Sequence, residues 1–185
     1  ENKIIVAGGQ ENMSRAPHAI FYREDKKLDE NKLVDTMIND GLIDSFNNYH
    51  MGITAENVAE KYKISRDEQD LFALNSQEKT QKAINENRFK NELIKLKIDT
   101  DNKNFLFEKD EHPRSNLNLE DLKKLKTVFK ENGTVTAGNS SGINDGAAAT
   151  ILMSREESEL RTIEPLAKVV SWATCGVEPS LMGLG

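Results

Sequence analysis

The chain has 185 residues, 37% of them hydrophobic and 30% charged, which is typical of a globular protein with one buried core. Its formal net charge of −6, from 31 acidic and 25 basic side chains, argues against broad binding to nucleic acid, which needs a basic surface. No apolar run approaches the roughly 20 residues of a membrane span, and a single cysteine, Cys175, excludes an internal disulfide.

The two ends of the sequence predict a truncated domain. A strand-like run begins at residue 3, and the last residues form a glycine-rich turn. Complete domains rarely begin in a core strand and end inside a loop, so we expect truncation at both ends, with a neatly trimmed domain as the alternative. With the N-terminus expected to be absent, we predict a cytoplasmic location and keep a mitochondrial one as the alternative.

A strand and two helices are predicted first. Residues 4–7 are continuously apolar and precede Gly8 and Gly9, which predicts a buried strand that ends in a tight turn. Residues 15–49 are charged and rich in asparagine, and they predict a long excursion with one helix over 32–39. Thr54 opens the second helix. Its apolar face is expected at Ala55, Val58, Ala59 and Tyr62.

A third helix is predicted to follow a capping box, in which a Ser side chain and a Glu side chain bind the free backbone amides of a helix start. Ser65 and Glu68 have the spacing of this box, and the helix is expected to run to about residue 87. Its apolar stripe is expected at Leu71, Leu74, Ala83 and Ile84.

Beyond this helix the pattern predicts a hairpin and a short helix. Residues 93–98 alternate apolar side chains with lysine, which predicts a half-buried strand that pairs with residues 105–107. Asn118 is expected to cap a helix that continues to residue 126, because acidic residues follow it in the first turn.

The most unusual segment, 133–149, is small, polar and rich in glycine, and it passes into an apolar run over 147–153. Ser154 opens a second predicted capping box, and residues 166–172 predict another strand. Strands and helices are therefore mixed. We expect parallel pairing at the continuous apolar runs, in a protein of the α/β class.

The strongest chemical signal is the small-residue loop 137–146. Glycines allow a backbone to approach a ligand closely, and free amides beside hydroxyls bind phosphate or carbonyl oxygen. The spacing is not that of a phosphate-binding P-loop, because no Gly-Lys-Ser/Thr follows. The alternative interpretation is a tight buried turn between packed elements.

Other candidates are weaker. His50 lies just before a helix start and could line a pocket, although a histidine at such a place is more often an ordinary surface or core residue. His18, His50 and His112 lack metal-ligand spacing, so we assign no metal site. Most carboxylates are expected on solvated helix faces. Cys175 has apolar flanks and no histidine nearby in sequence, which favours a structural thiol over a nucleophile.

Five runs, taken together, resemble the thiolase family, and they resemble its acetyl-CoA acetyltransferases most. They occur in order and cover essentially the whole chain, over residues 6–14, 50–59, 65–70, 133–149 and 170–185. The resemblance implies a layered α/β fold of two similar halves, each a mixed five-stranded sheet with helices, and a long loop domain that covers the coenzyme. This chain would hold an incomplete part of that fold: 1–14 from the N-terminal half, 15–132 as the loop domain, 133–163 back in the N-terminal half, and 164–185 from the C-terminal half.

The resemblance also implies an acyltransferase that condenses two acetyl-CoA molecules to acetoacetyl-CoA and coenzyme A (CoA), or runs the reverse thiolysis. Its reactive cysteine would lie before residue 1, and its histidine and second cysteine beyond residue 185. We therefore assign no catalytic residue to this chain and expect it to be inactive alone. The alternative is a non-catalytic, thiolase-like subunit that binds acyl-CoA.

The family's substrate-binding positions can be carried over to nine residues. Leu42 and His50 would lie beside the pantetheine arm, and Met51 and Met182 would narrow the acyl pocket. The other five would line the coenzyme groove, with Gln77 and Arg114 near its adenine and phosphate end and the Ser141 hydroxyl on the pantetheine amide: Gln77, Arg114, Phe129, Ala137 and Ser141. Ser140 stands where the family commonly has Ala.

The resemblance finally implies partners. These are acetyl-CoA, acetoacetyl-CoA and CoA, with no resident cofactor, because the coenzyme thioester is the substrate. Residues 15–37 match the loop through which dimers join, so a homotetramer is expected for the longer parent. No nucleic-acid or membrane partner is expected.

Overall fold

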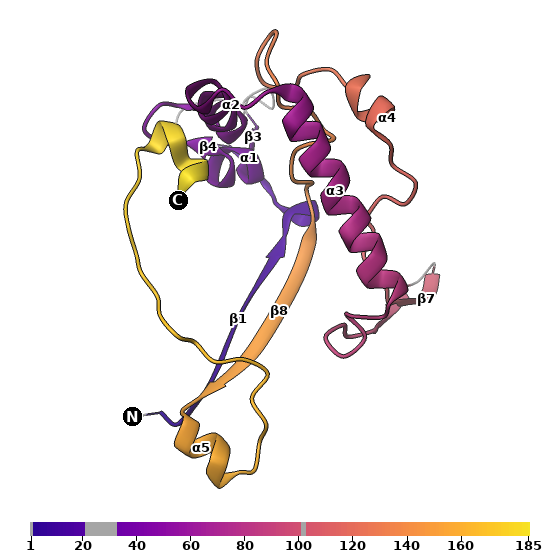
Figure 1. The fold of residues 1–185 in the computed structure, drawn as a ribbon, viewed down its shortest axis with the longest axis vertical. Coiled ribbons are helices and arrows are strands. Elements are labelled where there is room, and N and C mark those ends of the chain that lie inside the picture. The colour runs from indigo at the N-terminus through magenta and orange to yellow at the C-terminus, as the bar shows by residue number, and fades with distance from the viewer. Residues whose placement is uncertain (1, 21–32, 101–102) are drawn as a thin grey trace. The chain divides into compact units, whose positions relative to one another are not determined.

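The computed structural model describes residues 2–20, 33–100 and 103–185. The chain divides into two compact units (Figure 1). The first combines Glu1–Met51 with Ile143–Gly185, and the second is Gly52–Gly142. Among the described residues, no helix has both the length and the apolar character needed to cross a membrane.

A long two-stranded ribbon dominates the first unit. Strand β1 (Ile4–Asn12) pairs with β8 (Asp145–Met153) in antiparallel register, from Ile4 opposite Met153 to Asn12 opposite Asp145. The parallel pairing predicted for the continuous apolar runs is therefore wrong here. The predicted turn at Gly8 and Gly9 is also wrong, because β1 continues through both. A Cβ atom on Gly8 would lie 2.3 Å from the carbonyl oxygen of Ala148, so this glycine permits close strand approach.

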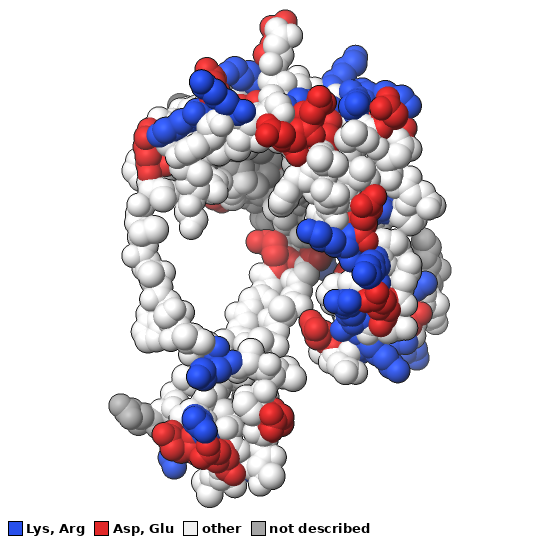
Figure 2. Space-filling model, viewed as in Figure 1, with Lys and Arg blue, Asp and Glu red and all other residues white. Residues whose placement is uncertain are grey.

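The ribbon is exposed rather than buried as predicted. The Val6 side chain is 72% exposed and Ile151 is 64% exposed, because among the described residues only β1 and β8 belong to this sheet. Figure 2 shows the surface over β1 and β8 as mostly uncharged. The strand predicted over 166–172 is absent from this described region, where Trp172 is 87% exposed. A strand needs a neighbour to accept its backbone hydrogen bonds, and this segment has none.

Short elements complete the first unit. Helix η1 (Met13–Arg15) follows β1, and β2 (His18–Ala19) pairs with β3 (Val34–Asp35). Helix α1 (Thr36–Gly41) replaces the helix predicted over 32–39, of which residue 32 lies outside the described residues. It begins later because Asp35 caps it, accepting from the amides of Met37 and Ile38. Strand β4 (Ile43–Asp44) pairs with β5 (Tyr49–His50), and η3 (Pro179–Leu184) lies near the end of the chain.

Helix α5 (Arg155–Leu160) follows β8, and Ser154 caps it as predicted. The predicted second half of the box differs. The Glu157 side chain accepts from Arg161 at 2.6 Å, and Glu156 takes its place beside Ser154. The pKa of Glu156 is lowered first by its own backbone amide and then by the Ser154 hydroxyl.

The second unit contains the two longest helices, α2 (Met51–Tyr62) and α3 (Arg66–Asn85). The capping box of Ser65 and Glu68 at the start of α3 is confirmed. The predicted hairpin is confirmed too, as β6 (Leu96–Thr100) paired with β7 (Lys103–Phe107). Asn118 caps α4 (Leu119–Lys123), which ends three residues before the predicted residue 126.

The inward faces of α2 and α3 are more polar than predicted. On α2, Gly52, Thr54, Glu56 and Ala59 are buried, whereas Ala55 and Tyr62, predicted to face the core, are exposed. On α3 only Asp70 is fully buried; Leu71 is 49% exposed and Ile84 is 42% exposed. The apolar spacing identified both helices but predicted their buried faces only in part: Ala59 is buried as predicted, while the buried Glu56 and Asp70 are polar and bind the segment after α4.

Candidate functional site

A buried carboxylate on α2 binds the glycine-rich segment that follows α4. Glu56 is 3% exposed and accepts hydrogen bonds from the Thr134 amide at 2.9 Å, the Val135 amide at 2.8 Å and the Thr134 hydroxyl at 3.0 Å. A Cβ atom on Gly133 would lie 2.3 Å from a Glu56 oxygen, so the backbone can approach the carboxylate only at a glycine. The first turn of the segment is thus fixed to α2.

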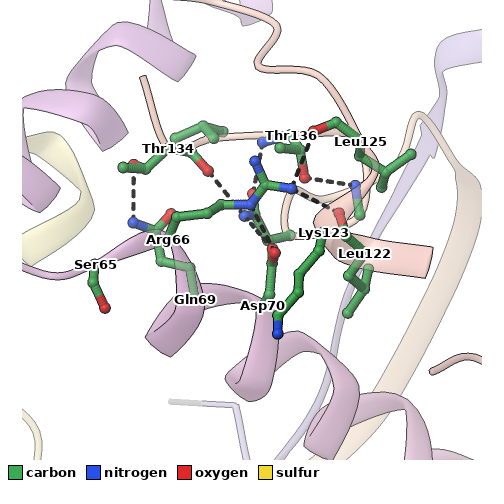
Figure 3. Close-up of polar contacts among 12 residues, drawn as sticks. Ser65, Arg66, Gln69, Asp70, Leu122, Lys123, Leu125, Thr134 and Thr136 are labelled. Carbon is green, nitrogen blue, oxygen red and sulfur yellow. Dashed lines mark hydrogen bonds and ion pairs between the residues drawn. The ribbon is translucent and has the colours of Figure 1, made fainter. Parts of the chain in front are cut away.

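A second buried carboxylate fixes the segment to α3. Asp70 is fully buried, and one of its oxygens accepts from the Arg66 guanidinium at 2.7 Å while the other accepts from the Asn139 amide at 3.0 Å. The same guanidinium donates to the carbonyl oxygens of Leu122 at 2.6 Å and Leu125 at 3.1 Å (Figure 3). Asp70 and Arg66 therefore join three segments of the second unit, namely α3, the end of α4 and the loop.

The loop reverses tightly above these anchors. The Asn139 side chain accepts from the Thr136 amide at 2.7 Å, and Ser140 donates to the Thr136 carbonyl at 2.6 Å. Gly138 packs against α4, where a Cβ atom would lie 2.5 Å from the Leu122 side chain. Ala137 and Ser141 are exposed, so the anchored loop presents both of these predicted site residues to solvent.

Two other predicted site residues meet farther along α3. The Gln77 side chain accepts from the Arg114 backbone amide at 2.8 Å. Both residues line an open groove of about 460 Å³, together with other residues of α3 and of the segment before α4: Leu74, Glu78, Gln81, Lys82, Asn85, Glu86, Asn116 and Leu117. The groove offers amide groups, an arginine, a lysine and two carboxylates to a polar ligand.

Phe129 packs against the start of α2. A Cβ atom on Gly52 would lie 2.3 Å from the Phe129 ring, so the glycine makes room for the aromatic side chain. Beside it, Lys130 donates to Glu60 at 2.8 Å, and this bond lowers the pKa of the Glu60 carboxyl. Phe129 is half-buried, which leaves part of the ring accessible.

The remaining predicted residues belong to the first unit. The Met51 amide donates to the Leu42 carbonyl at 2.7 Å, and His50 pairs with Ile43 in the β4–β5 hairpin, so Leu42, His50 and Met51 lie together and are each half-buried. Met182 lies in η3 and is 44% exposed.

The residues that sequence reasoning missed are the anchors. We predicted that most carboxylates lie on solvated helix faces, and Glu56 and Asp70 are exceptions to this. One signal was available: Gly52, Glu56 and Ala59 share one face of α2, so a carboxylate stands within a stripe of small residues. For Asp70 the signal was the Arg66 partner one turn earlier. Within the described part of the chain, no three His, Cys, Asp or Glu residues are arranged to hold a metal ion.

Comparisons with known proteins identify the family of the chain. The family model described as "Thiolase, N-terminal domain" matches residues 1–156. An acetyl-CoA acetyltransferase of Rhizobium meliloti (strain 1021) is 50% identical over 183 residues, which are 99% of this chain and 47% of the relative. The crystal structure of the Bacillus anthracis acetyl-CoA acetyltransferase aligns with a TM-score of 0.92 at 40% identity, over 99% of this chain and 46% of that one.

A human mitochondrial 3-ketoacyl-CoA thiolase solved in complex with CoA aligns with a TM-score of 0.88 at 37% identity, over 99% of this chain and 46% of that chain. The chain therefore spans about half the length of the curated relatives and solved structures that it matches. The predicted layered α/β fold, present only in part, is confirmed by these alignments.

Proposed function

Because the chain belongs to the thiolase family, we propose that it carries much of the coenzyme groove and acyl pocket of an acetyl-CoA C-acetyltransferase. The parent protein would join two acetyl-CoA molecules into acetoacetyl-CoA and free CoA, or cleave acetoacetyl-CoA with CoA. The names of the relatives, as acetyl-CoA acetyltransferases, support the acetyl substrate, and the CoA complex of a structural neighbour supports the coenzyme.

The anchored loop is the observation that carries this proposal. Two buried carboxylates, Glu56 and Asp70, fix the segment, while Ala137 and Ser141 stay exposed. A hydroxyl held in this way can bond the amide of a pantetheine arm without first losing much conformational freedom. The backbone beside it is small enough to let the arm approach closely.

The other predicted residues supply the rest of the groove. Arg114, whose backbone is held by Gln77, would pair with phosphate oxygens, for which a guanidinium is well suited. Phe129 would offer an apolar wall beside the arm. Leu42, His50 and Met51 would lie near the thioester, with Met51 and Met182 restricting the acyl group to a short chain.

The bond-breaking groups would come from the rest of the parent. Acyl transfer of this kind needs a thiolate nucleophile, a proton-transfer group and donors for the developing oxyanion. None of these is assigned to the present chain, whose contribution would be binding and orientation. We also propose the division that the family resemblance implies: 1–14 and 133–163 in the N-terminal half, 15–132 as the loop domain, and 164–185 in the C-terminal half.

The test is the Ser141→Ala variant of the complete gene product. Removing one hydrogen bond to the coenzyme should weaken CoA binding by about 1 kcal/mol, measured by calorimetric titration with CoA. Ser140→Ala is the matched control, because the Ser140 hydroxyl binds the Thr136 carbonyl. Unchanged affinity in Ser141→Ala would contradict the assignment. Tight CoA binding without thiolysis of acetoacetyl-CoA would instead identify a non-catalytic acyl-CoA-binding protein.

Assembly and location are proposed on the same basis. Residues 15–37 would join two dimers into a homotetramer, although 21–32 lie outside the described residues. Light scattering of the complete gene product would measure its mass, and a dimer would contradict the tetramer. We propose a cytoplasmic location, with the mitochondrion as the alternative, and imaging of the tagged gene product distinguishes them.

A further inference from the structure

One side chain fixes the conformation of the small-residue loop 137–146. The Asn139 side-chain oxygen accepts from the Thr136 amide at 2.7 Å, and its nitrogen donates to the Thr134 carbonyl and the Asp70 carboxylate, both at 3.0 Å. Asn139 thus satisfies two backbone groups at the start of the loop and one buried acid outside it. Asn139 lies two residues before Ser141, but its side-chain oxygen and nitrogen bind other parts of the protein.

The acid that receives Asn139 cannot easily move. Asp70 is 0% exposed, and its second oxygen is held by Arg66, which is itself bound to the carbonyl oxygens of Leu122 and Leu125. A buried carboxylate without its donors is strongly disfavoured, so each partner keeps the others in place. These contacts therefore fix the position of Asn139 relative to α3 and the end of α4.

The same face of α3 fixes the other end of the predicted groove. Gln77 is seven residues, or two turns, beyond Asp70, which places the two side chains on one face about 10 Å apart along the helix axis. Gln77 accepts from the Arg114 amide, as Asp70 accepts from Asn139. One rigid helix therefore sets the spacing between the loop with Ser141 and the segment with Arg114.

We propose that Asn139 is a positioning residue for coenzyme recognition, acting by tying the loop 137–141 to Asp70 on α3. The inference rests on the proposed function, because it assigns the purpose of the anchored loop to CoA binding. Asn139 does not touch the coenzyme; it keeps the Ser141 hydroxyl at a fixed distance from Arg114. Loss of Asn139 should therefore weaken CoA binding far more than it changes the chemical step.

The experiment compares Asn139→Ala, Asn139→Ser and Ser140→Ala in the complete gene product. Kinetics of acetoacetyl-CoA thiolysis are measured with CoA as the varied substrate. Asn139→Ala should raise the KM for CoA about tenfold and lower kcat less than about threefold, because three scaffold hydrogen bonds are lost. Asn139→Ser retains a short acceptor near the Thr136 amide and should give an intermediate KM. Ser140→Ala, which loses one hydrogen bond in the same loop, should stay within about twofold of the unsubstituted protein.

Hydrogen exchange provides a readout independent of activity. The amides of 134–142 should exchange faster in Asn139→Ala than in Ser140→Ala. If Asn139→Ala is too unstable for kinetics, the Asn139→Ser variant and the exchange measurement still test the inference. Folded Asn139 variants with an unchanged KM for CoA, or an equal KM rise in Ser140→Ala, would overturn the inference. Failure of the unsubstituted protein to bind CoA would instead refute the proposed function, which separates the two outcomes.

Discussion

At the scale of single residues, the second unit depends on buried polar groups more than on apolar ones. Glu56, Asp70 and Thr136 are each at most 3% exposed, and the carboxylates among them are fully hydrogen-bonded. Such groups cost folding free energy unless every polar atom is satisfied. These buried groups hold the segment after α4, which is consistent with a segment that must keep a single backbone conformation.

The Glu56→Gln variant tests this use of a buried acid. One oxygen that accepts backbone amides would become an NH2 group facing other donors, so the free energy of unfolding should fall by about 1–3 kcal/mol. Urea unfolding of the chain measures the change. Glu60→Gln, one turn later on the exposed side of α2 and paired with Lys130, should have a much smaller effect. Equal effects would mean that the Glu56 hydrogen bonds contribute little to stability.

At the scale of elements, helix starts were predictable and helix faces were predictable only in part. Ser65, Asn118 and Ser154 were all predicted as caps and all cap helices, because a cap depends on residues within one turn. The inward face of α2 depends instead on a partner 78 residues away, the Thr134 amide, which no local pattern reveals. The strand predicted over 166–172 failed for the same reason, since pairing needs a distant neighbour.

The capping box of α3 should give the chain a pH-dependent stability. The pKa of Glu68 is lowered below its ordinary value of 4.5, first by the Ser65 amide and then by the Ser65 hydroxyl. Because the folded-state pKa is the lower one, this stabilisation is present above the unfolded-state pKa and is lost as the pH falls through the folded-state pKa. Ser65→Ala should therefore cost about 1 kcal/mol at pH 7, and this difference should shrink under acid conditions.

Urea unfolding at a series of pH values measures the Ser65→Ala effect. Ser76→Ala, at an exposed position within the same helix, serves as the control and should be neutral or slightly stabilising, because Ala has the higher helix propensity. A Ser65→Ala cost that is constant from neutral to acid pH would show that the Ser65 hydroxyl does not help to lower the pKa of Glu68.

At the scale of the whole molecule, the apolar surface indicates that more chain belongs to this fold. The β1–β8 ribbon and the segment 166–172 expose large apolar side chains, while relatives with the same fold are about twice as long. Contiguous apolar surface of this kind marks a site of further burial. The family resemblance was readable from the sequence, but the exposure was not, since strand periodicity assumes a covered sheet.

Trp172 reports this exposure directly, because it is the only tryptophan in the chain and is 87% exposed. In the 185-residue chain its fluorescence should resemble that of a solvated indole and should be quenched readily by acrylamide. In the complete gene product, we expect a blue-shifted emission and weaker quenching. A protected tryptophan in the 185-residue chain would show that the segment packs against its own chain or a second copy.

The last prediction concerns Cys175 and the activity of the chain alone. Thiolysis needs a thiolate stabilised by a cationic or dipolar neighbour. Cys175, the only cysteine, is exposed in an irregular segment that contains no helix start within residues 163–178. The purified chain should therefore consume acetoacetyl-CoA and CoA no faster than buffer, and Cys175→Ser should behave identically. The Rhizobium meliloti acetyl-CoA acetyltransferase serves as the positive control. Thiolysis proportional to chain concentration would refute the prediction, and its loss in Cys175→Ser would identify Cys175 as the nucleophile.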